Sequence, residues 1–560
     1  MAKYLVKITI PSIQDTIVRS RKLKDLTGGS ELIPRIMQSG LKSLANDGKV
    51  EFIIPTADVV KEDSLNITNV AYLAIEGEKE QVTEKVKRMK EEMLKKLNTL
   101  VDTVKHRIPD KEFSIYENLI RYQIKNAINI VWAISEIKDN NIVKAKNDVD
   151  IAVANAKASI EPDDKFIEGF NLIQKQKNQY SAFENYQDFM EKAYQINPEL
   201  IRGAYLCEVC GKRVILGATK NNFKSSITEK DEEDRLCAFC YAKRYYHGKH
   251  KKSVVDVALK KYLAEHGNRI QEIFKKHGKI DLLEEDKQNI YIEVLENNGE
   301  NPDLIKSLNE LYREIGKPPV YYAIVVMDGD SMGEKISKAF EENKIKIITK
   351  KLSEFSKEVK GIVEKYSGMS VYSGGDDLLA LFPLKTVLEG YKEIVEKFKE
   401  YMKDTGYNFT ASAGLVISHY KIPLNYVLQE ARSAESKAKK VDGKDAVYIK
   451  YIKHSFSSAE APIKNDHLQL FEELISFLSD EDFPFGFIYQ LQELLLPYLP
   501  KTENEEPVKK LTKYLIEKKP YKRKDEFAKF MLDTKELFDF KEPEKIINTL
   551  KVAKFIASGV

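Results

Sequence analysis

Two short acidic groups adjoin apolar runs in this chain of 560 residues. The first group, at 328–330, reads Asp-Gly-Asp and follows the run 321–327. The second, at 374–377, reads Gly-Gly-Asp-Asp and precedes the run 378–382. Carboxylate oxygens are the ligands that Mg²⁺ prefers, and paired divalent ions hold the attacking and leaving oxygens of phosphoryl transfer. The two groups therefore predict a divalent-metal site for phosphoryl-transfer chemistry.

A tight hairpin is the element that must carry the second group. Primed turns need positive φ, which glycine adopts without steric cost, and strand-like runs lie on both sides of the glycine pair. Successive strand residues point to opposite faces, so Asp376 and Asp377 cannot share a site unless the strand is distorted. We expect Asp376 to be the primary metal ligand and Asp377 to be its neighbour. A strand ending in Asp328 beside such a hairpin is how palm-type polymerases and nucleotide cyclases hold two magnesium ions.

Each acidic group also has an ordinary explanation. The Gly-Gly-Asp-Asp stretch alone fits a solvated turn, and Asp328 and Asp330 alone fit N-caps of the helix that follows. Their joint occurrence in one predicted βαββαβ unit favours the metal site, with Asp328, Asp330 and Asp376 as ligands of Mg²⁺ or Mn²⁺.

Basic residues end the helix predicted over 424–440 in the same unit. Lys437 and Lys440 are three residues apart and so share a helix face, where they could neutralise a triphosphate; a solvated helix end explains them equally well. The strand at 409–417 is rich in small side chains, which let a helix or a ligand approach closely. A strand at 446–449 is expected to close the unit.

Four cysteines form two Cys-x-x-Cys pairs, Cys207 with Cys210 and Cys237 with Cys240. Four thiolates are the ligand set of a closed, structural tetrahedral zinc site. A buried thiol cluster or a redox pair are the alternatives. The polar insert between the pairs, around 220–234, is expected to be a loop.

Composition limits the remaining classes. The length suggests three to five domains. With 90 basic and 87 acidic residues the formal charge is +3, so any nucleic-acid binding must use local patches. No signal peptide or membrane-spanning run is evident, and the paired cysteines suit a reducing cytoplasm.

The start of the chain predicts another ferredoxin-like unit. It has strands at 4–10, 52–55 and 71–75, a helix over 13–44 that is expected to break near Gly28 and Gly29, and a charged helix over 79–105. Its first strand runs into Pro11 and Ser12 where the later unit has aspartates, and no Gly-Gly-Asp-Asp hairpin follows. If both units are palms, the first therefore lacks metal ligands.

The other segments are predicted to be helical. Trp132 lies in one of them, 113–200, and is expected in its core; 253–315 and 465–560 are the others. The stretch 241–252 interleaves basic and aromatic residues, which suits RNA backbone contact and base stacking. The basic patch 518–524 could face RNA or a protein partner. The side chains of Arg19, Arg21, Lys22 and Lys24 could face phosphates. A solvated surface is the alternative for all three groups.

Taken together, these motifs resemble a known family. The segment 327–333, the Ser-Gly-Gly-Asp-Asp at 373–377, the paired cysteines and the basic helix around 19–30 are similar to the large subunit of type III-B CRISPR effector complexes, the Cmr type. The resemblance covers most of the chain. It implies an α+β protein with four domains. The first two are a palm-like domain without metal ligands at 1–165 and a helical region with the four-cysteine zinc site at 166–315. The others are a second palm or cyclase domain at 316–455 and a C-terminal helical domain at 456–560.

The resemblance further implies an antiviral, RNA-guided complex with other Cmr subunits, guide RNA and target RNA. The chain would be a magnesium-dependent nucleotidyltransferase that uses ATP when target RNA is bound and makes cyclic oligoadenylate, or joins AMP to S-adenosylmethionine. The catalytic residues would be Asp328, Asp376 and Asp377. Nucleotide contacts are assigned to Gly329, Ser373, Gly374, Gly375, Lys437 and Lys440.

One departure from the family concerns DNA cleavage. Many relatives carry an N-terminal nuclease domain with a His-Asp motif, whereas none of the eight histidines here precedes an aspartate. We therefore expect no single-stranded DNase activity. A non-enzymatic RNA-binding scaffold and a stand-alone cyclic-dinucleotide cyclase are the competing functions. The intact acidic groups argue against the scaffold, and the second palm, the cysteine pairs and the helical tail are unneeded for the cyclase.

Overall fold

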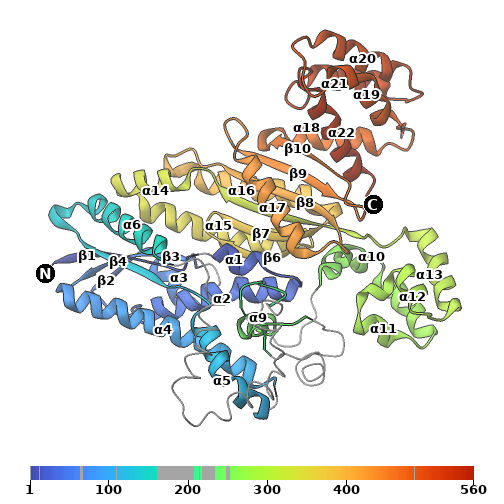
Figure 1. Ribbon diagram of the computed structural model, residues 1–560. Coiled ribbons are helices and arrows are strands. Elements are labelled where there is room, and N and C mark those ends of the chain that lie inside the picture. The colour runs from blue at the N-terminus through green and yellow to red at the C-terminus, as the bar shows by residue number, and fades with distance from the viewer. Residues whose placement is uncertain are drawn as a thin grey trace, which may run out of the picture. The chain divides into compact units, whose positions relative to one another are not determined.

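The computed structural model describes residues 2–11, 13–62, 67–108, 110–160, 207–213, 215–216, 234–246, 253–484 and 486–559. The expected helices of 161–200, the insert at 217–233 and the basic stretch 247–252 lie outside these residues. The chain forms two compact units, one of Met1–Lys252 with Met332–Ser356 and the other of Ser253–Ser331 with Lys357–Val560. Figure 1 shows their elements.

The first unit contains a four-stranded antiparallel sheet in the order β2-β3-β1-β4. This is the strand order of a ferredoxin-like unit. Its strands are β1 (Lys3–Thr9), β2 (Val50–Ile54), β3 (Val70–Glu76) and β4 (Val131–Glu136). The three strands expected from the sequence are confirmed, but β4 was expected to be helical. Trp132 is therefore a partly buried strand residue and not part of a helix core.

The helices of the first unit are α1 (Ile13–Val18), α2 (Leu23–Lys42), α3 (Ala57–Lys61), α4 (Lys79–Lys105), α5 (Asp110–Lys125), α6 (Ile142–Ala158), α9 (Ala238–Arg244) and α14 (Met332–Glu341). Helix α4 has the bounds that the sequence predicted. The break expected at Gly28 and Gly29 is wrong, because α2 continues through both. A Cβ atom on Gly28 would lie 2.0 Å from the carbonyl oxygen of Lys243 on α9. These glycines therefore serve a close helix–helix approach.

The second unit contains a six-stranded sheet in the order β10-β9-β8-β5-β7-β6. Its strands are β5 (Tyr321–Gly329), β6 (Met369–Gly374), β7 (Asp377–Pro383), β8 (Ala411–His419), β9 (Ala446–Ile452) and β10 (Ser458–Lys464). Strand β5 lies between β7 and β8 and is antiparallel to both. The expectation that β9 is the last strand is wrong, because β10 adds an edge. Pro462 fits there, since an edge strand tolerates a residue without an N–H.

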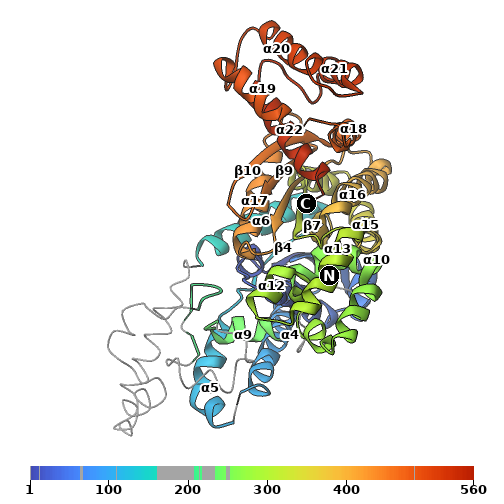
Figure 2. The ribbon, with the colours of Figure 1, turned by 90° about the vertical axis from the view of Figure 1, so that its right-hand side faces the viewer.

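The second unit also contains helices. They are α10 (Val254–Lys276), α11 (Ile280–Glu285), α12 (Ile292–Asn297), α13 (Pro302–Ile315), α16 (Val387–Met402), α17 (Leu424–Ala438), α18 (Leu468–Ser479), α19 (Phe487–Leu495), α20 (Glu506–Glu517), α21 (Lys524–Asp533) and α22 (Pro543–Ala557); α15 (Ile345–Lys365) runs from one unit into the other. Helix α22 packs against β10 and α18, as both views show (Figures 1 and 2). The helical character expected for 465–560 is confirmed.

Candidate active site and metal centre

Strand β5 and the β6–β7 hairpin bring the two acidic groups to one end of the sheet. Met327 pairs with Leu378, so Asp328 at the end of β5 lies beside the start of β7. Gly374 pairs with Asp377, which leaves Gly375 and Asp376 as a two-residue turn. Gly375 has a φ of 73°, the left-handed conformation that such a turn requires of its first central residue. The hairpin expected from the sequence is confirmed.

Gly374 is a glycine for a different reason. A Cβ atom there would lie 2.1 Å from the hydroxyl oxygen of Tyr372 on the same strand. Strand β6 also shifts its register between Ser370 and Tyr372, which is a local distortion next to the turn. The glycine pair therefore combines a turn conformation at Gly375 with a close side-chain approach at Gly374.

The carboxylates of Asp328, Asp376 and Asp377 interact directly. The Gly329 N–H hydrogen-bonds to the Asp376 carboxylate, and Asp328 and Asp377 are hydrogen-bonded through their side chains. Asp376 lies in the turn and not within a strand, so strand alternation does not separate it from Asp377. All three side chains are half-buried.

Gathering three acids in one place changes their protonation. Burial and then the charge of Asp328 raise the pKa of Asp376 to about 7. Burial and the hydrogen bond to Asp328 raise the pKa of Asp377 well above its ordinary value. Burial alone would raise the pKa of Asp328, but hydrogen bonds with Asp377 and Lys439 lower it. The group thus carries mutual repulsion that a bound cation would relieve.

Lys439 is the cation beside these acids, and it was missed from the sequence. Its ammonium group pairs with Asp328 and lies 2.9 Å from Glu435 one helical turn earlier. Burial lowers the pKa of Lys439, but the hydrogen bonds to Asp328 and Glu435 outweigh this and raise it. The positive charge of Arg432 also acts to lower the pKa of Asp328 and of Asp377. Arg432 and Lys439 are seven residues apart and so lie on the same helix face. This spacing was the signal in the sequence that could have identified Lys439.

Helix α17 reaches the site because β8 lets it approach closely. A Cβ atom on Gly414 would lie 2.1 Å from the Ala431 carbonyl oxygen and 2.5 Å from the Glu435 nitrogen. The expectation that small residues of this strand admit a helix is confirmed. A larger side chain at Gly414 would move α17, and with it Lys439, away from Asp328.

Asp330, the remaining acid of the expected metal set, is held by hydrogen bonds within the protein. Its side chain is 2% exposed. The hydroxyls of Thr410 and Ser412 donate to its two oxygens at 2.8 Å each, and the Asp445 N–H donates at 3.1 Å. Both carboxylate oxygens are therefore engaged in holding β5 to β8 and to the loop before β9.

That loop adds a second basic residue near the site. Gly443, Lys444 and Asp445 all have positive φ, between 47° and 68°. Consecutive left-handed residues are strained unless neighbouring contacts hold them. Here the Asp445 N–H bonds Asp330, and the Lys444 ammonium donates to the Ser331 hydroxyl at 2.8 Å. Lys444 therefore lies at the turn that follows Asp328.

The two lysines chosen from the sequence lie elsewhere. Lys437 pairs with Glu460 on β10 and lies 5.1 Å from the centre of the Tyr448 ring. Lys440 is exposed at the end of α17. The remaining nucleotide-contact candidates, Ser373 and the two glycines, belong to the hairpin itself.

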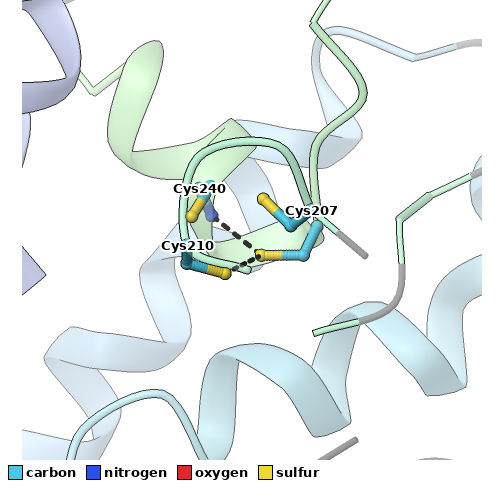
Figure 3. Close-up of side chains that lie close together, drawn as sticks. Cys207, Cys210 and Cys240 are labelled. Carbon is cyan, nitrogen blue, oxygen red and sulfur yellow. Dashed lines mark hydrogen bonds between the residues drawn. The ribbon is translucent and has the colours of Figure 1, made fainter. Parts of the chain in front are cut away.

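The four cysteines form a buried cluster in the first unit. Their sulfur atoms all lie within 4.8 Å of one another, and no disulfide joins them (Figure 3). The Sγ atoms of Cys210 and Cys237 are 3.9 Å apart. Zinc–sulfur bonds of about 2.3 Å in a tetrahedron require sulfur atoms about 3.8 Å apart. The cluster thus fits a zinc ion, and among the described residues it is the one group with such closely spaced ligand atoms.

The basic residues that follow the second cysteine pair are buried. Arg244 is fully buried and donates to Asp25 through Nε at 2.6 Å and Nη2 at 2.9 Å. The Lys243 ammonium donates to the carbonyl oxygens of Thr16 and Arg19 at 2.9 and 2.8 Å. For the described part of 241–252, both the RNA-facing and the solvated interpretations are therefore wrong, because these side chains fasten α9 to α2 and to the segment before it.

Other basic residues are similarly engaged by protein groups. Arg21 pairs with Asp234 at 2.8 Å, and Arg19 donates to the Cys210 carbonyl oxygen, so the basic segment of the first unit contacts the cysteine region. In the stretch 518–524, Arg523 pairs with Asp480 at 3.0 Å and lies 4.2 Å from the centre of the Phe477 ring.

Two family models match most of the strands of the two sheets. Residues 5–133 match the N-terminal part of the CRISPR-associated protein Cmr2, and residues 321–448 match the second palm domain of Cas10/Cmr2. The Cmr subunit Cmr2 of Pyrococcus furiosus is 26% identical over 546 residues, covering 81% of this chain. Residues 5–133 and 321–448 thus belong to the Cmr2 and Cas10/Cmr2 families, and the resemblance to Cmr2 large subunits is confirmed. The chain spans 62% of the length of the Pyrococcus relative.

Solved structures of type III-B Cmr-beta complexes share the Cmr2 fold. The apo complex contains a chain with a TM-score of 0.64 and 14% identity, covering 99% of this chain and 82% of that one. A chain in the complex bound to cognate target RNA gives a TM-score of 0.65 at 13% identity, with 99% and 83% coverage. The match at 321–448 makes the carboxylate-bearing sheet a palm domain. No described helix is both long and apolar enough to cross a membrane.

Proposed function

We propose that this chain is the nucleotidyltransferase subunit of an RNA-guided antiviral complex. It would act on ATP when target RNA is bound, together with guide RNA and other Cmr subunits. The observation that supports this proposal is the group of Asp328, Asp376 and Asp377 on a palm sheet, with repelling charges and one lysine as counter-ion. A protein that only holds RNA has no evident need to gather like charges in one place.

The carboxylates fit divalent metal ions of the hard, oxygen-seeking kind. Asp328 and Asp376, with Asp377 beside them, would hold Mg²⁺ or Mn²⁺. Bound there, such ions supply charge neutralisation for attack of a ribose 3′-oxygen on the α-phosphate and for the departing pyrophosphate. Asp330 is left out of the ligand set, because its oxygens already accept three hydrogen bonds.

The chain's own groups contribute positioning and charge. The Gly329 N–H orients the Asp376 carboxylate. Once Asp328 is neutralised, the Lys439 ammonium no longer serves as its counter-ion and can contact a phosphate, as can Lys444 beside Ser331. We therefore assign triphosphate binding to Lys439 and Lys444 ahead of Lys437 and Lys440. The four-cysteine cluster would hold zinc in a structural role, since four protein ligands leave no open position.

The product is proposed to be cyclic oligoadenylate or a conjugate of AMP with S-adenosylmethionine. The test uses radiolabelled ATP, magnesium and the assembled complex with target RNA. Wild type should release pyrophosphate and form an adenylate that the Asp376→Asn/Asp377→Asn variant does not form, and addition of S-adenosylmethionine identifies the acceptor. Asp404→Asn, which removes an exposed carboxylate of the same unit, is the matched control. If wild type and the double variant are equally inactive on ATP, the scaffold function replaces the enzymatic one.

A further inference from the structure

The loop between β9 and β10 presents an exposed aromatic ring in a strained conformation. The Phe456 N–H donates to the Lys453 carbonyl oxygen at 2.8 Å, and the Lys453 N–H donates to the Ser457 carbonyl oxygen at 3.0 Å. These bonds close a three-residue hairpin loop whose last residue must be left-handed, a position usually filled by glycine. Phe456 occupies it with a φ of 62°, and its side chain is 59% exposed.

This combination is unfavourable for folding. A bulky residue at positive φ is a genuine outlier, and strain of this kind tends to occur at functional sites. Phe456 has little compensating burial, because its one ring contact with a described residue is an edge-to-face contact with Tyr426 at 5.9 Å. The loop therefore displays the ring outward at a position where glycine would fold more easily.

A second exposed ring in the same loop rests on a rigid aromatic stack. The His454 ring is 5.0 Å from the ring of His419. His419 in turn stacks on Tyr420 at 4.9 Å, and Tyr420 stacks on Tyr291 at 4.9 Å with the planes 8° apart. His454 is exposed at the end of this series. The loop thus offers two ring surfaces, one of them held in place by buried neighbours.

The charge around these rings is positive. Residues 450–458 include two lysines, one histidine and three serines but no acid. The Lys453 ammonium lies 5.7 and 5.9 Å from the ring centres of Tyr451 and Phe555 and has no carboxylate partner among the described residues. Carboxylates on adjoining elements are already paired, Glu430 with Lys450 at 2.5 Å and Glu293 with Lys421 at 2.7 Å.

We propose that the β9–β10 loop, residues 453–457, is a contact site for single-stranded RNA. Exposed rings stack on bases, while a lysine and hydroxyls contact phosphates, and this pairing of groups is typical of single-strand binding. A protein partner that inserts an apolar anchor would not need the unpaired cation. This inference rests on the RNA partner of the proposed function and adds the place of contact, but it does not depend on the nucleotidyltransferase chemistry.

The test measures binding of a fluorescent oligouridylate of about a dozen nucleotides to the full chain without ATP. Phe456→Gly should weaken binding about tenfold, the loss of roughly one stacked base. Its thermal midpoint should not fall, because glycine suits the φ of 62°. Phe456→Tyr should keep the affinity. Ile151→Ala, which trims a side chain that is 61% exposed on α6, should leave affinity unchanged.

Ultraviolet cross-linking then locates the contact. Cross-links from the RNA to residues 453–457, lost in Phe456→Gly, are the expected result. The proposal is overturned if the oligouridylate does not bind, if Phe456→Gly binds as tightly as wild type, or if a duplex of the same length competes equally well. Cross-links from this loop to another protein subunit in the assembled complex, without cross-links to RNA, would also overturn it. None of these readouts requires ATP turnover, so this proposal and the enzymatic one can fail separately.

Discussion

Replacing Arg244 with methionine should loosen the contact between α9 and α2 without affecting RNA binding. Asp25 and Arg244 are both fully buried and joined by two hydrogen bonds of 2.6 and 2.9 Å. Burial alone would raise the pKa of Asp25, but the hydrogen bond and charge of Arg244 lower it. Methionine fills much of the same volume but leaves the Asp25 carboxylate buried without its partner. Breaking one side of a buried pair costs about 3–5 kcal/mol.

Amide hydrogen exchange of the zinc-loaded chain measures this cost locally. The free energy of about 3–5 kcal/mol corresponds to exchange faster by roughly two to nearly four orders of magnitude in α9 and the first turns of α2. Exchange in β5 and β8 should be unchanged. Asp25→Asn/Arg244→Met removes both charges and should recover part of the protection. The reasoning is refuted if amide exchange in α9 of Arg244→Met is less than about tenfold faster than in wild type. It is also refuted if RNA binding is lost while α9 keeps its wild-type protection from exchange.

Four further predictions concern other positions. Gly414→Ala should destabilise the second unit by about 1–3 kcal/mol, because the new Cβ atom meets the backbone oxygen of Ala431, whereas Gly361→Ala, with open space around it, should not; thermal midpoints of the two variants decide this. Cys240→Ser should lose the zinc that wild type releases on denaturation, as metal analysis would show; full retention would contradict the four-cysteine site. Lys439→Gln should lower kcat/KM for ATP about 10- to 100-fold, the value of a charged hydrogen bond, and Lys440→Gln should lower it less; equal losses would argue against the assignment. Burial, with His454 and Lys421, lowers the pKa of His419 from 6.5 to about 4. The unfolded state therefore takes up this proton first, so stability should be lost as pH falls from 6.5 towards 4, and His419→Gln should show a shallower fall of the thermal midpoint over that range.

Local sequence patterns determined most of the helices and strands and pointed to the candidate active-site residues. The Gly-Gly-Asp-Asp hairpin, the strand ending in Asp328 and the amphipathic helix 79–105 follow from turn chemistry and from periods of two and 3.6, which act between near neighbours. The Cys-x-x-Cys pairs likewise indicated a four-thiol cluster that could bind a metal ion, because short spacing and ligand type are local properties. The sequence also placed Asp328, Asp376 and Asp377 together, since adjacent strands of one sheet bring their ends together.

Only the tertiary structure decided which charged side chains share that site. Asp328 and Asp330 are two residues apart, yet one faces Lys439 and the other is held by Thr410, Ser412 and Asp445. Lys439 could not be told from its lysine neighbours by composition, because the close approach of α17 to Gly414 fixes which one reaches the acids. The sequence pattern indicated that Lys243 and Arg244 face solvent or RNA. In the structure both are buried, because Arg244 pairs with Asp25 and Lys243 packs against a pair of glycines more than two hundred residues earlier. Contacts between segments distant in the chain set burial and pairing, and so the assignment of each charge depends on the completed fold.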